Sequence, residues 1–265
     1  MKKISSKDNE IIKHIRKLKD KKYRDEKIKY VAKLILNKKF RENEKKFVIE
    51  GFKAIYDAYC FGLKLNDVFV HNSFLEKFDF LDETKLTLVE DNILKKISTT
   101  ESFSKCVAVF DMVGYSLNDL KTKNTIVLLE NIKDGGNLGT IIRSANAFGV
   151  DGIVLYGDTI DIYNSKVIRS SVGNFLKIPI VKVNDIEAIK ATFKTHTFYA
   201  TKVDTNIDLK TIKFEEKKVI MFGSEAEGLS DKLFDIADKF FTIKMQNKVE
   251  SLNLSVAASI IFYSL

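Results

Sequence analysis

The chain has 265 residues, of which 45% are hydrophobic, and its 44 Lys and Arg against 36 Asp and Glu give a formal net charge of +8. Two cysteines, Cys60 and Cys106, and three scattered histidines are too few for a disulfide framework or a metal site, so we expect no metal. No apolar run is long enough to span a bilayer, and the polar amino terminus lacks the apolar core of a signal peptide. We therefore expect a cytoplasmic protein with no membrane contact.

The positive charge lies at the amino-terminal end. Residues 1–50 hold 18 basic and 8 acidic side chains, whereas the rest of the chain holds 26 basic and 28 acidic ones. A solvated helix surface in a lysine-rich chain has this composition. However, the basic residues between Lys17 and Arg24 are interleaved with Tyr23, a ring on which a base can stack, and clustered cations bind phosphates. We therefore expect a basic helical arm over residues 1–45 that contacts nucleic acid.

Strand and helix patterns then alternate over residues 46–113, which predicts a small α/β domain. The expected strands are short and rich in β-branched and aromatic residues, at 47–51, 65–71, 85–91 and 106–112. Helical patterns occupy 52–61 and 72–81, and Gly62 is placed to end the first of them.

A second, larger α/β domain is expected over residues 120–265, after a polar, turn-rich stretch at 113–124 that predicts a linker. Several of its strands are continuously apolar, which is typical of a parallel sheet covered by helices on both faces. The expected strands are at 125–132, 152–157, 178–183, 198–203, 218–223 and 240–245. Ligands bind beyond the carboxyl ends of such strands, so the loops that follow them are the places to search for a site.

The first of three such loops, 131–139, contains three glycines and is followed by a helical pattern that Gly149 ends. Glycines permit a tight turn, and the amino terminus of a helix favours an anion. Arg143 is expected one turn inside this helix and is its only cation. A generic strand-to-helix turn with a surface arginine fits the same residues, because the loop is neither a dinucleotide-binding fingerprint nor a P-loop.

The second loop, 223–230, has Gly223 and Gly228 placed so that the backbone can line a pocket. Its two carboxylates, Glu225 and Glu227, can bind hydroxyl groups or a cation. By itself the segment fits a simple turn with two solvated carboxylates and with Ser230 as the amino-terminal cap of the next helix.

The third segment, 249–259, leads from the last expected strand into the final helix. Ser251, Asn253 and Ser255 are each able to cap that helix. A single cap explains one of the three polar residues, but it does not explain the small side chains at 257–259. These small side chains indicate that another group approaches the start of the helix closely.

Together and in this order, the three segments resemble the motifs of the SpoU (TrmH-like) RNA ribose 2′-O-methyltransferases of the SPOUT superfamily. The first motif, N-x-G-x-x-x-R, is matched by Asn137, Gly139 and Arg143, and the second, G-S-E-x-x-G-L-S, by residues 223–230. The third, I-P-M followed by S-L-N-V-S-V-A-A, is matched by Ile243, Met245, Ser251, Leu252, Asn253 and 255–258. The likeness covers residues 120–265.

The sequence departs from the family pattern in two places. Lys244 stands where the family usually has Pro, within the segment expected to approach the cofactor. The amino-terminal part resembles the smaller substrate-binding domain of rRNA-directed members, but it lacks the Pro-Gln-Gly usually found before the last strand. The resemblance implies an α/β fold whose carboxyl-terminal domain has a parallel sheet and a deep trefoil knot. It also implies S-adenosyl-L-methionine bound in that knot and a homodimer with its active site near the subunit interface.

The resemblance also implies roles for single residues. The set expected to face the RNA and carry catalysis comprises Asn137, Arg143, Ser251 and Asn253. The residues expected to hold the cofactor are Gly223, Ser224, Glu225, Gly228, Ile243, Met245 and Leu252. We expect Arg143 to clamp a phosphate, because a guanidinium stays protonated and cannot take the ribose proton. The acceptor of that proton is left open, and Glu225 is expected to hold a structural hydrogen bond.

The expected activity is S-adenosylmethionine-dependent 2′-O-methylation of RNA, and the additional amino-terminal domain and basic arm favour 23S rRNA. One alternative is a tRNA 2′-O-methyltransferase. Another is a non-catalytic RNA-binding protein of the same fold, although the presence of Arg143, Ser251 and Asn253 argues against it. A dinucleotide-binding oxidoreductase is disfavoured because its glycine fingerprint is missing. Ribosome maintenance and antibiotic resistance both use this chemistry, and both remain open as its purpose.

Overall fold

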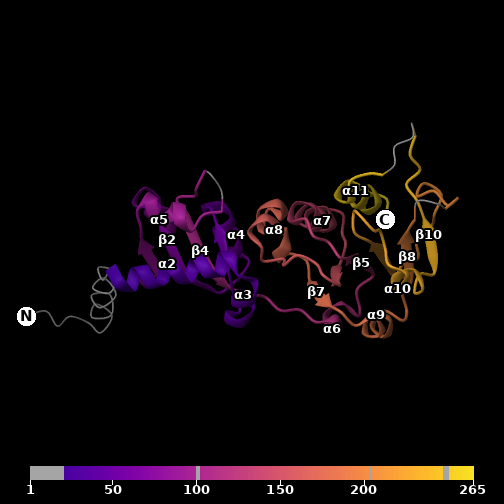
Figure 1. Ribbon diagram of the computed structural model, residues 1–265, viewed down its shortest axis with the longest axis horizontal. Helices are drawn as coiled ribbons and strands as arrows, with labels where there is room; N and C mark the ends of the chain where they lie inside the picture. Colours follow the sequence, from indigo (N-terminus) through magenta and orange to yellow (C-terminus); the bar gives the residue numbers. More distant parts are fainter. Residues whose placement is uncertain (1–20, 100–101, 203–204, 247–250) are drawn as a thin grey trace, which may run out of the picture. The chain divides into compact units, whose positions relative to one another are not determined.

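The computed structural model describes residues 21–99, 102–202, 205–246 and 251–265, with side chains described from residue 25 onward (Figure 1). The chain divides into two compact units, Met1–Val113 and Gly114–Leu265. Residues 1–20 of the expected basic arm, together with the side chain of Tyr23, lie outside the described part of the chain. Within that part, no helix is long and apolar enough to cross a membrane.

Unit 1 (Met1–Val113) is built on a four-stranded mixed sheet in the order β1-β4-β2-β3. Strand β4 is antiparallel to β1 and β2, while β2 is parallel to β3. A strand is present at each of the four expected places, which confirms the smaller α/β unit. The strands are β1 (Lys46–Glu50), β2 (Leu65–Val70), β3 (Leu86–Leu88) and β4 (Cys106–Asp111).

The helices of unit 1 differ from the expected pattern at 72–81, where a short 3-10 helix forms instead of an α-helix. The ring of His71 accepts a hydrogen bond from the Ser73 amide (3.2 Å), so a local side-chain bond holds the first turn. The helical elements are α2 (Lys21–Leu36), α3 (Lys38–Glu44), α4 (Phe52–Cys60), η1 (Asn72–Phe78), η2 (Glu83–Lys85) and α5 (Asp91–Lys96).

Helices α2 and α3 belong to unit 1 rather than to a separate arm. Ile28, Val31 and Leu34 recur at helical spacing along α2 and are buried in one cluster with Phe69 of the sheet. Arg41 of α3 is only 3% exposed, and it donates to the backbone oxygen of Leu34 (2.6 Å) at the end of α2. The expected boundary at residue 45 therefore does not separate two domains. Counting charges missed this, because the many lysines of α2 surround a buried apolar face.

Unit 2 (Gly114–Leu265) contains a six-stranded sheet in the order β10-β8-β9-β5-β6-β7. Every pairing in it is parallel, which confirms the expected parallel-sheet domain. The strands are β5 (Thr125–Glu130), β6 (Gly152–Tyr156), β7 (Ile180–Val183), β8 (Thr197–Thr201), β9 (Lys218–Phe222) and β10 (Lys239–Phe241). The helices are α6 (Leu117–Leu120), α7 (Gly135–Ala147), α8 (Ser165–Ser171), η3 (Asn174–Leu176), α9 (Ile186–Thr192), α10 (Asp231–Phe234) and α11 (Leu254–Tyr263).

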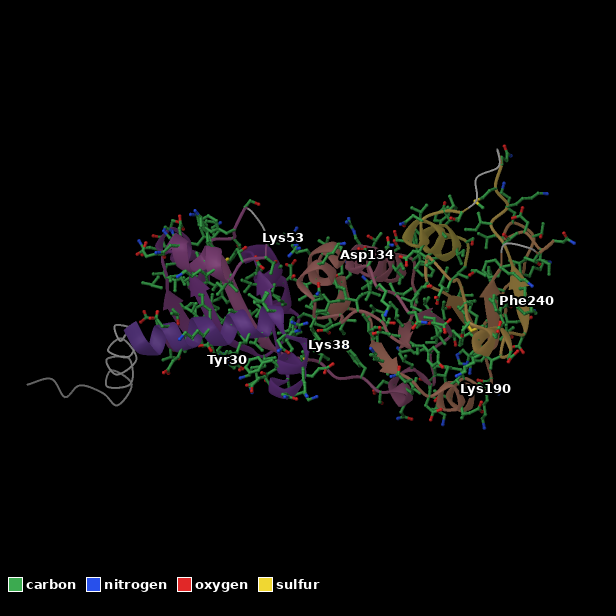
Figure 2. All side chains as sticks on the ribbon, in the orientation of Figure 1. Tyr30, Lys38, Lys53, Asp134, Lys190 and Phe240 are labelled. Atoms are coloured by element: carbon green, nitrogen blue, oxygen red, sulfur yellow. The ribbon has the colours of Figure 1, made fainter. Side chains whose placement is uncertain are left out.

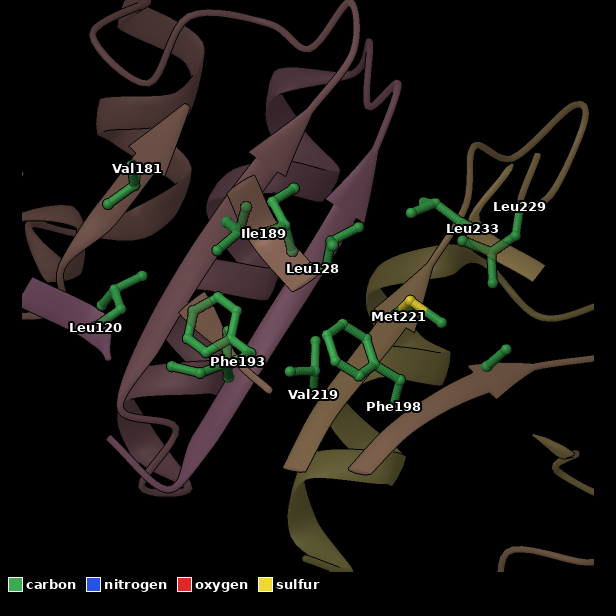
Figure 3. Packing of buried hydrophobic residues seen from close by; sticks show 13 residues of the cluster. Leu120, Leu128, Val181, Ile189, Phe193, Phe198, Val219, Met221, Leu229 and Leu233 are labelled. Carbon is green, nitrogen blue, oxygen red and sulfur yellow. The ribbon is translucent and has the colours of Figure 1, made fainter. Parts of the chain in front are cut away.

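Helices cover both faces of this sheet. On one face, Leu128 of β5 and Met221 of β9 belong to a buried cluster with Phe193, which follows α9, and Leu233 of α10 (Figure 3). On the other face, α7 packs against both α8 and α11 (Figure 1). The next residue of β9, Phe222, therefore meets α11, where its ring centroid lies 5.9 Å from that of Phe262.

The stretch expected to be a linker contains a helix, α6, whose first turn is closed by a capping box between Ser116 and Asp119. Leu120, at the end of α6, is fully buried in the sheet core. A Cβ atom on Gly152 would lie 2.4 Å from the Leu120 side chain. Because of its polar residues the stretch was expected to be a linker, yet one leucine anchors it to unit 2.

The strand order places a switch point between β5 and β9. From β5 the chain continues to the neighbouring β6 and then to β7 at one edge, whereas from β9 it continues to β10 at the opposite edge. The loops that follow β5 and β9 therefore leave in opposite directions from adjacent strands. A crevice at such a point is where open α/β sheets bind ligands.

Candidate functional site

The first motif lies inside a helix rather than in a loop before one. Helix α7 starts at Gly135, and its cap is Asp134, whose side chain accepts a hydrogen bond from the Asn137 amide (2.9 Å; Figure 2 labels Asp134). A hydrogen bond from Lys166, followed by the Asn137 amide, holds the pKa of the Asp134 carboxyl below its usual value. The expected start after Gly139 was wrong, because this cap and the surrounding packing outweigh the poor helix propensity of the glycines.

Arg143 is the ninth residue of α7, so it lies more than two turns from the start of the helix rather than one. Its side chain is exposed, and it makes no hydrogen bond or ion pair with any residue that the structure describes. A guanidinium in this condition is available to a phosphate, which it can bind through two parallel N–H groups.

Gly139 is required by the close contact between α7 and α8. A Cβ atom at this position would lie 1.9 Å from Ser170 Oγ and 2.8 Å from the backbone nitrogen of Ser171. Ser170 Oγ also donates to the backbone oxygen of Gly135 (2.9 Å), which joins the two helices where α7 begins. The glycine of the first motif therefore serves helix packing.

The second motif forms a tight turn after β9. The backbones of Ser224 and Gly228 exchange two hydrogen bonds, of 3.1 and 3.0 Å. Gly228 has a φ of +69°, and a Cβ atom on Gly223 would lie 1.9 Å from the carbonyl group of Gly228. Both glycines are therefore needed for the turn, and Glu225 is exposed within it.

The third motif opens α11, and Asn253 is its cap. Asn253 Oδ1 accepts hydrogen bonds from the Ser255 amide (2.9 Å) and the Ser255 hydroxyl (2.7 Å). One turn further along, Ser259 Oγ lies 2.7 Å from Ser144 Oγ of α7, and Ala258 is fully buried. The small residues of this motif are thus explained by the close approach of α11 to α7.

The three motifs meet through one side chain each, and we call these three side chains the amide junction: Asn137, Glu225 and Asn253. Asn137 Nδ2 donates to Glu225 Oε1, and Asn253 Nδ2 donates to Asn137 Oδ1 (3.1 Å). These bonds connect positions 88 and 116 residues apart in the sequence. Both ends of the Asn137 amide are used, so its orientation is fixed from two sides.

The remaining expected site residues belong to the second and third motifs. Gly223 is buried, whereas Ile243, Met245 and Leu252 are half-buried. Ser251 and Lys244 are exposed, and neither bonds to the amide junction within the described residues. The backbone just before Ile243 is fixed by hydrogen bonds of Thr242, which donates to Ile207 (2.9 Å) and accepts from Leu209 (2.8 Å). Across the described ranges, no group of three or more His, Cys, Asp and Glu side chains is placed to hold a metal ion.

Both units of the chain are similar to known proteins. Residues 124–263 match the SpoU rRNA Methylase family, and these residues include all three motifs. The chain belongs to the SpoU rRNA methylase family. Unit 2 is therefore its SpoU unit, and the expected family is confirmed. Residues 25–108 match the MRM3-like substrate binding domain, so that match begins within α2 and ends within β4, the last strand of unit 1.

Three relatives of this SpoU protein cover most of its length. The 23S rRNA (guanosine(2553)-2′-O)-methyltransferase RlmP of Bacillus subtilis is 28% identical over 86% of this chain and 91% of its own. The 23S rRNA (uridine(2479)-2′-O)-methyltransferase of Streptomyces viridochromogenes is 28% identical over 68% of this chain and 66% of its own. The crystal structure of an AdoMet-bound rRNA methyltransferase from Sinorhizobium meliloti is 27% identical, with a TM-score of 0.81 over 89% of this chain and 92% of that one.

Sequence reasoning missed Glu130 of the SpoU unit. This carboxylate ends the apolar strand β5, is only 3% exposed, and accepts a hydrogen bond from the Ser230 amide (2.8 Å). Ser230 does precede α10, as expected, but its side chain makes no capping bond. A charged residue at the end of a continuously apolar strand was the available signal, because such a residue is buried only with a partner.

Proposed function

We propose that this SpoU protein transfers a methyl group from S-adenosyl-L-methionine to the 2′-oxygen of a ribose in 23S rRNA. The observation that carries the proposal is the amide junction, which brings the three family motifs to the switch point of the sheet. RlmP, which matches over most of both chains, and the Streptomyces enzyme, which matches over about two thirds of each, are both named as 23S rRNA 2′-O-methyltransferases, and this supports both the reaction and the substrate. Such a substrate also favours a cytoplasmic location.

The residues of the second and third motifs fit the cofactor. Ile243, Met245 and Leu252 are half-buried apolar side chains, and they offer a surface for an adenosine ring. Gly228 leaves the backbone of the second motif open to close approach, because nothing lies within 4 Å of a Cβ atom built there, while Gly223 allows the turn to close behind it. When bound, S-adenosyl-L-methionine supplies a methyl group attached to a positively charged sulfur, and this methyl carbon is open to in-line attack with the sulfur as the leaving group.

The residues of the chain then have to align and orient the ribose. We assign this role to Asn137 and Asn253, whose amides are fixed by the junction, and to the exposed Ser251 beside them in the third motif. Arg143 holds a phosphate of the same nucleotide by a bidentate contact, and it is not the base because it stays protonated. Glu225 positions Asn137.

Two further properties are proposed for the SpoU unit, a knot and a homodimer. The chain leaves β10 at the edge of the sheet and returns to place α11 beside α7, a path that supports the trefoil knot.

Val256, Ile260 and Tyr263 form an apolar stripe on α11, with exposed fractions of 47%, 40% and 79%, and the exposed ring of Phe148 packs on Tyr263. We infer that a second copy covers this stripe, as in a homodimer.

The test is to incubate the purified protein with labelled S-adenosylmethionine and unmodified 23S rRNA, 16S rRNA and tRNA. We expect label in 23S rRNA alone, with one position that resists alkaline cleavage because its 2′-oxygen is blocked. Label confined to tRNA would keep the reaction and reject the substrate. Cofactor binding without transfer to any RNA, including RNA in ribosomal particles, would favour the non-catalytic RNA-binding protein.

A further inference from the structure

A pocket lies at the carboxyl ends of β5, β6 and β7, and Ser230, the last residue of the second motif, is part of its lining. It has a volume of about 430 Å³ and is lined by Glu130, Asn131, Tyr156, Gly157, Asn184, Ser230, Asp231 and Lys232. None of these residues belongs to the amide junction or to the expected cofactor set. The pocket is therefore a candidate for a ligand other than the cofactor.

The innermost group of this pocket is an incompletely paired carboxylate. Glu130 is 97% buried, as its exposed fraction is 3%, and its Oε2 accepts from the Ser230 amide (2.8 Å). In the described part of the chain, Glu130 has no other hydrogen-bond partner. A carboxylate offers about four lone-pair positions, and those that Ser230 leaves free face the pocket. A ligand that displaces water from the pocket must donate to this carboxylate, since an unpaired charge away from water is costly. The free oxygen therefore favours a ligand that donates hydrogen bonds.

Other groups of the pocket are polar and held in place. The Ser230 hydroxyl oxygen is buried, with no partner among the described residues. Asn131 has a φ of +55°, and its side chain accepts from the Asp158 amide (2.8 Å), so it is fixed at both its backbone and its amide. Gly157, with a φ of +74°, has no room for a side chain, because a Cβ atom there would lie 2.3 Å from Asn131 Oδ1. One wall of the pocket is thus rigid.

We propose that this pocket binds a guanine base of the substrate RNA by its Watson–Crick edge, an inference that rests on the proposed function. Guanine presents two adjacent donors there, N1–H and the 2-amino group, and both can reach a carboxylate. Adenine and cytosine present one amino group beside a lone pair, and uracil presents one N–H between two oxygens, so a carboxylate repels part of each edge. Tyr156 offers a ring for stacking, while Asn184 and Lys232 offer donors for the guanine oxygen.

The test measures binding of mononucleotides to the full-length protein by calorimetry, with 5′-GMP as the probe. We expect GMP to bind about tenfold more tightly than AMP, CMP or UMP, the usual effect of one bidentate base contact. IMP, which lacks the 2-amino group, is expected to bind more weakly than GMP. In the variant Glu130→Gln, the amide oxygen can still accept from Ser230, but its NH₂ group faces the guanine donors, so the preference for GMP should disappear.

A matched control is Asp235→Asn, which makes the same chemical change on an exposed residue just after α10 and outside the pocket. It should keep the preference for GMP. If Glu130→Gln does not fold, Asn184→Ala removes an exposed lining residue instead and should weaken GMP binding.

Equal binding of all four nucleotides, or unchanged GMP binding by Glu130→Gln, would reject the guanine pocket. Displacement of GMP by S-adenosylhomocysteine would assign the pocket to the cofactor instead. Methyl transfer by the unaltered protein is a separate measurement. Transfer without GMP preference rejects the pocket alone, whereas GMP preference without transfer to any RNA rejects the proposed function alone.

Discussion

At the scale of single residues, Asn253 uses the two ends of its amide for two purposes. Its oxygen caps α11, and its nitrogen donates to Asn137 and so joins the third motif to the first. A cap contributes to stability, whereas the bond to Asn137 orients a group that we assign to the ribose. Substitutions can separate the two contributions. A carboxylate at position 253 keeps the oxygen that caps the helix but lacks the N–H group that donates to Asn137.

We expect Asn253→Ala to lower the free energy of unfolding by about 1 kcal/mol, the usual cost of a lost cap. Asn253→Asp should leave stability close to that of the unaltered protein, since an anion at a helix start also caps it. Both variants should lose methyl transfer by about tenfold, the equivalent of one hydrogen bond. Urea unfolding and single-turnover transfer measure the two effects, and full activity in Asn253→Asp would remove the proposed role of its nitrogen.

Arg143 provides a second prediction at this scale. Arg143→Ala should abolish detectable transfer, a loss of about a hundredfold or more, because the phosphate of the nucleotide is no longer held in line. Cofactor binding, measured by equilibrium dialysis, should not change. Arg143→Lys keeps the charge and loses the bidentate geometry, so it should recover only part of the activity. Normal turnover by Arg143→Ala would reject the phosphate clamp.

At the scale of elements, the contact between α7 and α8 depends on Gly139. The higher helix propensity of alanine would by itself add about 1 kcal/mol to the free energy of unfolding in Gly139→Ala. We nevertheless expect a net loss of about 1–3 kcal/mol, because the added carbon meets Ser170 and the Ser171 backbone. Adding Ser170→Gly should recover part of the loss, since it removes the nearest atoms. Thermal unfolding followed by circular dichroism distinguishes these outcomes, and a more stable Gly139→Ala would contradict the close contact.

The strands were the most predictable elements. Each lies in a short run rich in apolar residues, and a strand is present at all ten expected places. The helices were harder, because tertiary contacts decide them. The start of α7 has three glycines that argue against a helix, and α6 has one buried leucine in a polar stretch. Likewise, α2 appeared as a charged arm because its lysines outnumber its buried positions.

The site was predictable in a different way. The order of the three motifs indicated the family, which the comparison confirms. Spacing alone did not show that Asn137, Glu225 and Asn253 would touch, because the bonds cross 88 and 116 residues. The roles given to Arg143 and Ser251 stay predictions.

At the scale of the whole molecule, we expect a homodimer through the apolar stripe of α11. Ile260→Asp places a charge at the centre of that stripe, and it should shift the protein to a monomer in light scattering after gel filtration. Lys190→Asp, on the exposed side of α9, is the control and should leave the dimer intact. A monomeric unaltered protein would reject the homodimer.

The burial of Leu120 bears on how the catalytic half can be produced on its own. A fragment that begins at residue 124, where the family match begins, would omit α6 and leave a hole in the sheet core beside Gly152. Losing such a leucine costs about 2–5 kcal/mol. We expect a fragment of residues 114–265 to melt at a clearly higher temperature than one of 124–265. Equal melting temperatures would show that α6 is dispensable. If the longer fragment is more stable, an isolated SpoU unit for spectroscopy should begin before Ser116.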